Sequence, residues 1–247
     1  MTLDGVPAAS LARRWGVPLA RVFRSLASSL DAVHDLASGG AAHGATVIAD
    51  EQTAGRGRDG RTWRSPPGGV WLAMLLRPGP GEIGALSIRA GLVVADAVDE
   101  LLGRAVARLK WPNDILLDGR KVGGVLCETR WLGDVPQWLA LGVGVNVANE
   151  VPAELVGRAT ALCEFLPDLR RIDLLDRLVP ALARVAAGRQ ALTEAERLAF
   201  AERDWLRGRT LRLPAPGRAD GLSPEGALLV DGGAGHVAVR EGHVELA

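Results

Sequence analysis

A nine-residue run from Gly55 to Trp63 constrains the fold of this chain more than any other stretch. It reads G-R-G-R-D-G-R-T-W, so three glycines alternate with three arginines before an aromatic residue. Glycine lets backbone amides come close to a ligand and adopts positive φ angles without steric cost. Arginine carries a permanent charge on a planar fork that suits carboxylate and phosphate oxygens. The run therefore predicts an anion-binding loop with Trp63 placed to stack on a flat ring; an arginine-rich surface turn is the simpler alternative.

The glycines of this run also spell G-x-G-x-x-G, the pattern of dinucleotide-binding folds. That fold requires a helix to begin at the loop, so that its N-terminus faces the pyrophosphate. Residues 62–69 read T-W-R-S-P-P-G-G and cannot propagate a helix. The H-R-D and D-F-G motifs that accompany a kinase glycine loop do not occur in the sequence. We therefore expect neither a dinucleotide-binding fold nor a kinase fold.

The composition indicates a globular chain without a membrane or nucleic-acid partner. The chain is 48% hydrophobic and carries no net charge, as is typical of a globular protein. Its 247 residues are enough for one large domain and a small one. No apolar run reaches the length of a membrane span, and residues 1–27 lack the core of a signal peptide, so we expect a cytoplasmic protein. Zero net charge argues against bulk binding of nucleic acid. Cys127 and Cys163 are expected to be reduced thiols, and the four histidines form no metal-ligand motif.

Hydrophobic periodicity predicts an α+β fold with a mixed sheet. Strand patterns follow one another through hairpin-like connections with few crossover helices, which disfavours a doubly wound parallel sheet. After Gly208 the pattern changes to short alternating runs, which predict a small SH3-like β-barrel. We therefore expect a catalytic domain at 1–207 and a barrel at 208–247. The expected helices lie at 11–15, 32–37 and 83–102 and within 170–207; the expected strands lie at 45–50, 69–77, 108–111, 115–117, 121–129, 137–147, 210–213, 227–230, 236–239 and 244–246, with a glycine-rich turn at 232–235.

Lysine is rare and falls in two motifs. Of the 29 basic residues only Lys110 and Lys121 are lysines. Lys110 opens K-W-P-N-D, which places an ammonium, an amide and the carboxylate of Asp114 within one turn. Such a carboxylate can bind Mg²⁺ or accept a proton from a nucleophile, although a strand-to-strand turn with a solvated Asn-Asp pair is the plain alternative.

Two glycine-containing strands complete the set of motifs. In K-V-G-G, Lys121 can point at a ligand while the bare backbone of Gly124 lets that ligand lie close. The run G-V-G-V-N at residues 142–146 ends in Asn146, and its glycines favour packing or a β-bulge over a ligand role.

Taken together, these motifs closely resemble those of biotin–protein ligases, which attach biotin to a lysine of a carrier domain. The resemblance covers roughly residues 28–246 and rests on the order and spacing of four motifs. They are E-Q-T-A-G-R-G-R-x-G-R-x-W at 51–63, K-W-P-N-D at 110–114, K-x-G-G at 121–124 and G-x-G-x-N at 142–146. The resemblance implies ATP-dependent formation of biotinyl-5′-AMP, with ATP and biotin as substrates, Mg²⁺ carried by ATP, and the biotin carboxyl carrier domain of a biotin-dependent carboxylase as partner.

The resemblance also implies a set of site residues. The biotin-binding residues would be Ser28, Ser29, Gln52, Gly55, Arg56, Gly57, Arg58, Lys121 and Gly124. The residues that bind ATP or the adenylate would be Arg56, Arg58, Trp63, Lys110, Asn113, Lys121 and Asn146. Lys121, Arg56, Lys110 and Asp114 would act in catalysis, with Asp114 assisting the acceptor lysine.

The reaction explains why cations gather in these motifs. Biotin's carboxylate must attack an α-phosphate, and the two anions repel each other. Arginines, lysines and Mg²⁺ offset that repulsion and stabilise the charge of the transition state. The mixed anhydride that forms would hydrolyse in free water, so a glycine loop that closes over it is useful.

One position departs from the family pattern. The family usually has S-T-N before the first helix, where this chain has Ser28-Ser29-Leu30. Leucine removes the hydrogen bonds of asparagine, so no ligand role is assigned to Leu30. This departure keeps open a non-catalytic biotin or nucleotide sensor. A lipoate– or octanoyl–protein ligase is the nearest rival enzyme, and a DNA-binding biotin repressor is disfavoured because residues 1–27 are too short for a winged helix-turn-helix domain.

Overall fold

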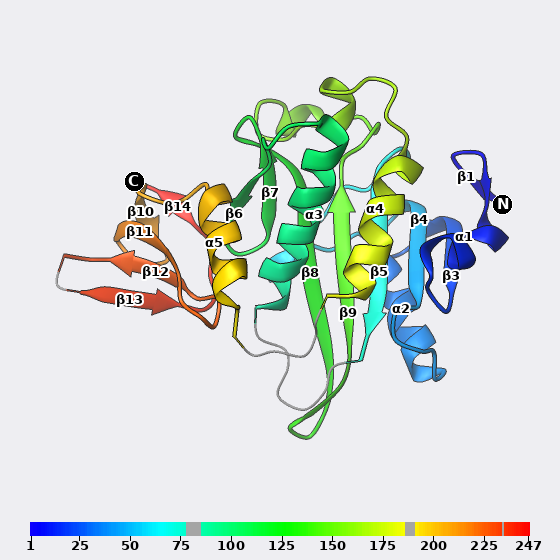
Figure 1. The fold of residues 1–247 in the computed structure, drawn as a ribbon, viewed down its shortest axis with the longest axis horizontal. Helices are drawn as coiled ribbons and strands as arrows, with labels where there is room; N and C mark the ends of the chain where they lie inside the picture. Colours follow the sequence, from blue (N-terminus) through cyan, green and yellow to red (C-terminus); the bar gives the residue numbers. More distant parts are fainter. Residues whose placement is uncertain (78–84, 186–190, 234) are drawn as a thin grey trace.

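A computed structural model describes residues 1–77, 85–185, 191–233 and 235–247 (Figure 1). Its centre is a seven-stranded mixed sheet in the order β3-β4-β5-β9-β8-β7-β6. Only β3 and β4 pair in parallel, and every other neighbouring pair in this sheet is antiparallel. The strands are β3 (Ala20–Leu26), β4 (Thr46–Gln52), β5 (Val70–Leu76), β6 (Arg108–Lys110), β7 (Asp114–Leu117), β8 (Arg120–Leu132) and β9 (Val135–Val145). The expected α+β fold with a mixed sheet is confirmed.

Helices cover both faces of this sheet. Helix α2 (Ser29–Ser38) buries Leu30 and Val33 against Val47, Ala73 and neighbouring small residues. Helices α3 (Leu86–Leu102) and α4 (Arg171–Ala183) pack on the opposite face, in front of β8, β9 and β5 in Figure 1. The two layers explain the strand pattern, because β5 is buried on both sides.

The first 27 residues belong to the same core. They form a two-stranded hairpin of β1 (Thr2–Leu3) and β2 (Val6–Pro7), helix α1 (Ala8–Trp15) and the edge strand β3. Leu11 and Trp15 of α1 are buried in the main hydrophobic cluster. Sequence periodicity missed β3, because this strand is only half buried and carries Arg21 and Arg24.

The C-terminal strands form a second, antiparallel sheet, seen at the left of Figure 1. Its order is β13-β12-β11-β10-β14, and the described residues contain no pairing of β13 with β14. The expected small β unit is confirmed, but the described strands do not close into a barrel. The strands are β10 (Thr210–Leu213), β11 (Gly217–Leu222), β12 (Leu228–Asp231), β13 (His236–Val239) and β14 (Glu245–Leu246), and helix α5 (Glu194–Arg203) precedes them.

Three expectations extend beyond the described residues: the start of the helix at 83–102, residues 186–190 within 170–207, and residue 234 of the glycine-rich turn. The remaining expected elements are confirmed within three residues of their ends, and the mostly helical region 170–207 contains α4 and α5. The sequence did not indicate β1, β2, β3 or β11. The sequence pattern does not indicate β11, because Gly217 and Gly221 lie within it and glycine has a low strand propensity.

Candidate active site

The glycine–arginine run folds back on itself as a tight loop. The Trp63 amide donates to the Gly55 carbonyl over 2.9 Å, and the Gly57 amide donates to the Arg61 carbonyl over 2.7 Å. A single 3₁₀ turn at Arg58–Gly60 closes the tip. A Cβ on Gly55 would lie 2.4 Å from the Trp63 carbonyl oxygen, so only glycine allows the two arms to approach. Since no α-helix begins here, the exclusion of a dinucleotide-binding fold is confirmed.

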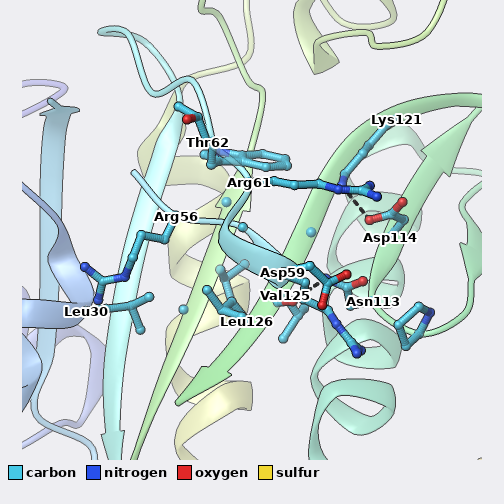
Figure 2. A pocket seen from close by; sticks show the side chains of 18 of the residues that line it. Leu30, Arg56, Asp59, Arg61, Thr62, Asn113, Asp114, Lys121, Val125 and Leu126 are labelled. Carbon is cyan, nitrogen blue, oxygen red and sulfur yellow. Dashed lines mark hydrogen bonds and ion pairs between the residues drawn. The ribbon is translucent and has the colours of Figure 1, made fainter. Parts of the chain in front are cut away.

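This loop borders a pocket, the central pocket, on the face of the sheet that α2 covers (Figure 2). Its walls come from the N-terminus of α2, the glycine–arginine loop, strands β5, β8 and β9 and the K-W-P-N-D segment. Its lining comprises Ser28, Ser29, Leu30, Gln52, Arg56, Gly57, Arg58, Asp59, Arg61, Thr62, Trp63, Trp71, Leu72, Lys110, Trp111, Pro112, Asn113, Asp114, Lys121, Gly124, Val125, Leu126, Gly142, Val143, Gly144, Gly242, His243 and Val244.

Strand register brings the separate motifs into one row. Lys110 pairs with Asp114, Asp114 with Gly124, and Gly124 with Gly144, across four neighbouring strands. Paired residues of adjacent strands lie on the same face of a sheet. The row therefore places an ammonium and a carboxylate beside a bare strip of two glycines. Sequence spacing alone could not show this alignment.

The bare strip receives the indole ring of Trp63. A Cβ on Gly144 would lie 2.8 Å from Cε2 and Nε1 of that ring, so the ring rests directly on the backbone of β9. The ring meets Trp71 edge-on, with centroids 6.4 Å apart. The Lys121 ammonium lies 4.9 Å from the Trp63 centroid, within the range of a cation–π contact. The packing interpretation of the β9 glycines is confirmed.

Lys121 and Asp114 form an ion pair inside the central pocket, with Nζ and Oδ1 2.5 Å apart. Figure 2 shows Arg61 directed toward this pair. Nearby, the Asn113 side-chain amide donates to the Val125 carbonyl over 2.7 Å, which holds the K-W-P-N-D segment on β8. Lys110 has no ion-pair partner among the described residues and lies 5.6 Å from the Trp205 ring. Burial lowers the pKa of Lys110 below its usual 10.5, although nearby Asp114 opposes the shift.

The other end of the central pocket contains a set of uncharged polar side chains beside Leu30. Ser28 and Ser29 are buried, and Ser28 caps α2 through a hydrogen bond from the Leu30 amide. The backbone amide and the hydroxyl of Ser29 both donate to Oε1 of Gln52, over 2.8 and 2.9 Å. Because a backbone amide can only donate, these bonds fix the Gln52 amide with its nitrogen toward Ser65. Leu30 fills the space above Gly142, 3.1 Å from the position a Cβ would take.

Two sequence-predicted residues lie outside the pocket lining. Gly55 lies at the base of the glycine–arginine loop, where it allows the close approach of the Trp63 carbonyl. Asn146 is buried, and its side-chain amide donates to the Thr160 carbonyl over 3.0 Å while its oxygen accepts from Asn149. All other predicted site residues line the central pocket, including Arg56 and Lys121 from two distant segments.

Sequence reasoning missed several lining residues. Arg61 stands in the glycine–arginine run itself and has no ion-pair partner among the described residues. Residues 242–244 reach the pocket from the C-terminal sheet, and nothing in the sequence indicated their approach. The described residues contain no group of three His, Cys, Asp or Glu side chains arranged to hold a metal ion. None of the described helices combines the length and apolar character of a membrane span.

Comparisons with known proteins agree on one family. Residues 23–146 match the model of the biotin/lipoate A/B protein ligase family. The chain is 32% identical over 236 residues to the bifunctional ligase/repressor BirA of Bacillus subtilis, covering 90% of this chain and 72% of that protein. It is 37% identical over 220 residues to the biotin–[acetyl-CoA-carboxylase] ligase of Paracoccus denitrificans, covering 81% of this chain and 89% of that protein.

Solved structures show the same architecture. The biotin protein ligase of Aquifex aeolicus in complex with biotin and ATP is similar with a TM-score of 0.76 at 27% identity, covering 93% of this chain and 99% of that one. The biotin protein ligase of Leishmania major in complex with biotinyl-5-AMP is similar with a TM-score of 0.65 at 27% identity, covering 93% and 98%.

Proposed function

Because this chain belongs to the biotin/lipoate A/B protein ligase family, we propose that it is an ATP-dependent biotin–protein ligase that works in the central pocket. In the first step a biotin carboxylate oxygen attacks the α-phosphorus of ATP. A new O–P bond forms, the bond to the β-phosphate oxygen breaks, and pyrophosphate leaves with biotinyl-5′-AMP as product. In the second step the neutral amine of a carrier lysine attacks the acyl carbon, and AMP leaves.

The observation that carries this proposal is the convergence of cations from separate segments on one hollow. Arg58 and Arg61 come from the loop, Lys110 from β6 and Lys121 from β8, and all four line the central pocket. Two anions must meet for the first step, and preorganised positive groups in a partly closed site lower its barrier. Lys121 supports attack because its ammonium can bridge the biotin carboxylate and the α-phosphate.

The two ends of the central pocket suit the two reactants. Ser29 and Gln52 offer neutral hydrogen-bond donors and acceptors for the ureido ring of biotin, with Leu30 beside them as an apolar wall. Trp63 offers a flat surface near Lys121 for the adenine ring. Base–aromatic stacking of this kind contributes about 1–3 kcal/mol per base.

Asp114 has a role in the second step that follows from its ion pair. When Lys121 moves its charge to the reacting anions, the Asp114 carboxylate becomes free to accept the proton of the attacking lysine. Mg²⁺ would enter with the ATP phosphates and neutralise their charge, which needs at most one or two protein carboxylates. Asp59 and Asp114 are the acidic side chains in the pocket lining.

We also propose four finer points. The acceptor is the biotin carboxyl carrier domain of a biotin-dependent carboxylase, and the reaction takes place in the cytoplasm. The catalytic and C-terminal domains meet between residues 207 and 208, which is supported by the positive φ of Gly208 just before β10. Asn146 acts on ATP only through the loop that it holds, since its side chain is committed to Thr160 and Asn149.

The test is incubation of the full chain with ATP and Mg²⁺ plus biotin, lipoate or octanoate in separate reactions, with pyrophosphate release as readout. We expect release with biotin alone. Release with lipoate or octanoate but not with biotin would assign the chain to the rival branch of the family. Tight binding of biotin without pyrophosphate release would identify a sensor.

A further inference from the structure

The guanidinium of Arg56 is held by two carboxylates that the proposed reaction does not use. Its Nε and Nη2 donate to the two oxygens of Glu128, each over 3.1 Å. Its Nη1 donates to Oδ2 of Asp31 over 3.1 Å, and its Nη2 lies 2.8 Å from Oδ1. Arg56 therefore contacts all four oxygens of two acidic residues, and the hydrogen bonds that it donates to Asp31 and then to Glu128 raise the pKa of Arg56 above its usual value.

These contacts neutralise Arg56 before any substrate arrives. One guanidinium between two carboxylates gives the cluster a net charge of minus one, so the cluster does not attract an anion. Figure 2 shows Arg56 extending toward Leu30, on the side of the pocket away from Lys121 and Asp114. Arg56 can turn its Nε and Nη2 donors toward the reacting anions only after it leaves Asp31 and Glu128.

Both carboxylates keep a partner when Arg56 leaves. The Asp31 side chain is 51% exposed, so water can solvate it. Glu128 is more buried, but its Oε2 lies 3.1 Å from Nε2 of His34. The Trp138 indole nitrogen lies 2.9 Å from Nδ1 of His34 and can only donate. Nδ1 of His34 is therefore the acceptor, and Nε2 carries the proton that it donates to Glu128.

The two carboxylates therefore have hydrogen-bond partners in two states, one with Arg56 bound to them and one with Arg56 released. We propose that Asp31 and Glu128 are positioning residues that retain Arg56 in the empty pocket and yield it to an anionic ligand, and that His34 and Trp138 keep Glu128 hydrogen-bonded after the exchange. Glu128 thereby lowers the affinity of the site for anions, because every anion that recruits Arg56 must replace it. The proposal rests on the proposed function, in which the biotin carboxylate is one such anion.

The test compares biotin with biotinamide, in which a neutral amide replaces the carboxylate. Isothermal titration calorimetry on the full chain measures both dissociation constants for wild type and for Glu128→Gln. Glutamine keeps an oxygen that accepts from His34 but removes the charge that competes for Arg56. We expect biotin to bind Glu128→Gln about twofold to fivefold more tightly, the size of a solvent-screened ion pair, and biotinamide to bind unchanged.

Two further variants complete the design. Arg56→Ala should erase the gain, so that the double variant with Glu128→Gln binds biotin like Arg56→Ala alone. Glu100→Gln is the matched control, since Glu100 pairs with Arg177 at 3.5 Å between α3 and α4 on the opposite face of the sheet; its affinity for biotin should equal that of wild type.

Asp31→Asn gives a second measurement should Glu128→Gln fail to fold, and we expect a gain of the same direction. A merely structural role for Glu128 would alter thermal unfolding or shift both ligands together, which would overturn the proposal. If wild type binds biotin but neither Glu128→Gln nor Asp31→Asn binds it more tightly, this proposal is overturned and the ligase assignment still holds. A wild-type chain that binds no biotin refutes both.

Discussion

The contact between Trp63 and the bare strip of β9 gives the sharpest test of the central pocket. In Gly144→Ala the new Cβ would lie 2.8 Å from Cε2 and Nε1 of the indole and 3.1 Å from Cζ2. The ring must move by about 0.6 Å to reach van der Waals distance. It cannot rotate freely, because Trp71 meets it edge-on and the glycine–arginine loop holds its backbone. Overpacking of this kind costs about 1–3 kcal/mol of unfolding free energy.

The same displacement should weaken ATP binding more than biotin binding. Loss of a stacked base costs about 1–3 kcal/mol, which corresponds to a rise in the dissociation constant of about fivefold to 150-fold. Calorimetric titration with ATP and with biotin, together with chemical denaturation, measures all three quantities. Gly91→Ala in α3 is the control, since its Cβ would meet nothing closer than 3.5 Å. A folded Gly144→Ala protein that binds ATP like wild type would refute the role of Trp63 as the adenine platform.

Three further predictions concern the cations of the central pocket. Lys121→Ala should abolish biotinyl-AMP formation while changing the unfolding free energy by no more than about 1 kcal/mol, since its ion pair is partly exposed; radiolabelled adenylate and denaturation curves measure the two effects. Arg58→Gly should release adenylate into solution, because this side chain lines the pocket beside the loop tip; free biotinyl-AMP in filtrates measures it, and an unchanged release rate would count against a guarding loop. Burial lowers the pKa of Lys110, so its charge is lost at a lower pH than for a free lysine, and kcat/KM for ATP should begin to fall at that lower pH as the pH rises. Lys110→Arg should move this fall to higher pH, because arginine stays charged. An identical pH profile in the two proteins would exclude Lys110 from ATP binding.

Much of the site was predictable because its signals are local. The alternation of Gly55, Arg56 and Gly57 predicts an anion-binding loop from residue types that are adjacent in the chain. Hydrophobic periodicity located most helices and strands, because burial on one face repeats every 3.6 or two residues. The strands predicted at 108–111, 115–117, 121–129 and 137–147 placed Lys110 and Lys121 in strands, with Asp114 at the turn between two of them.

Local patterns failed where elements depend on their neighbours. Strand β3 carries exposed arginines, because it is a half-buried edge that only β4 pairs with. The C-terminal sheet would close into a barrel only if its edge strands, β13 and β14, paired with each other. The sequence could not show this, because short strand patterns are the same in an open sheet and in a closed barrel.

Reading the residues in order is enough to know which chemical groups are present and which segments carry them: an arginine loop, two lysines and glycines that leave a strand bare. What each group touches follows from the folded arrangement of the chain. Glu128 lies 72 residues from Arg56 in the chain, and residues 242–244 join the pocket from a separate sheet. Ion pairs and pocket walls arise from contacts between distant segments, and such contacts leave no periodic trace in the sequence.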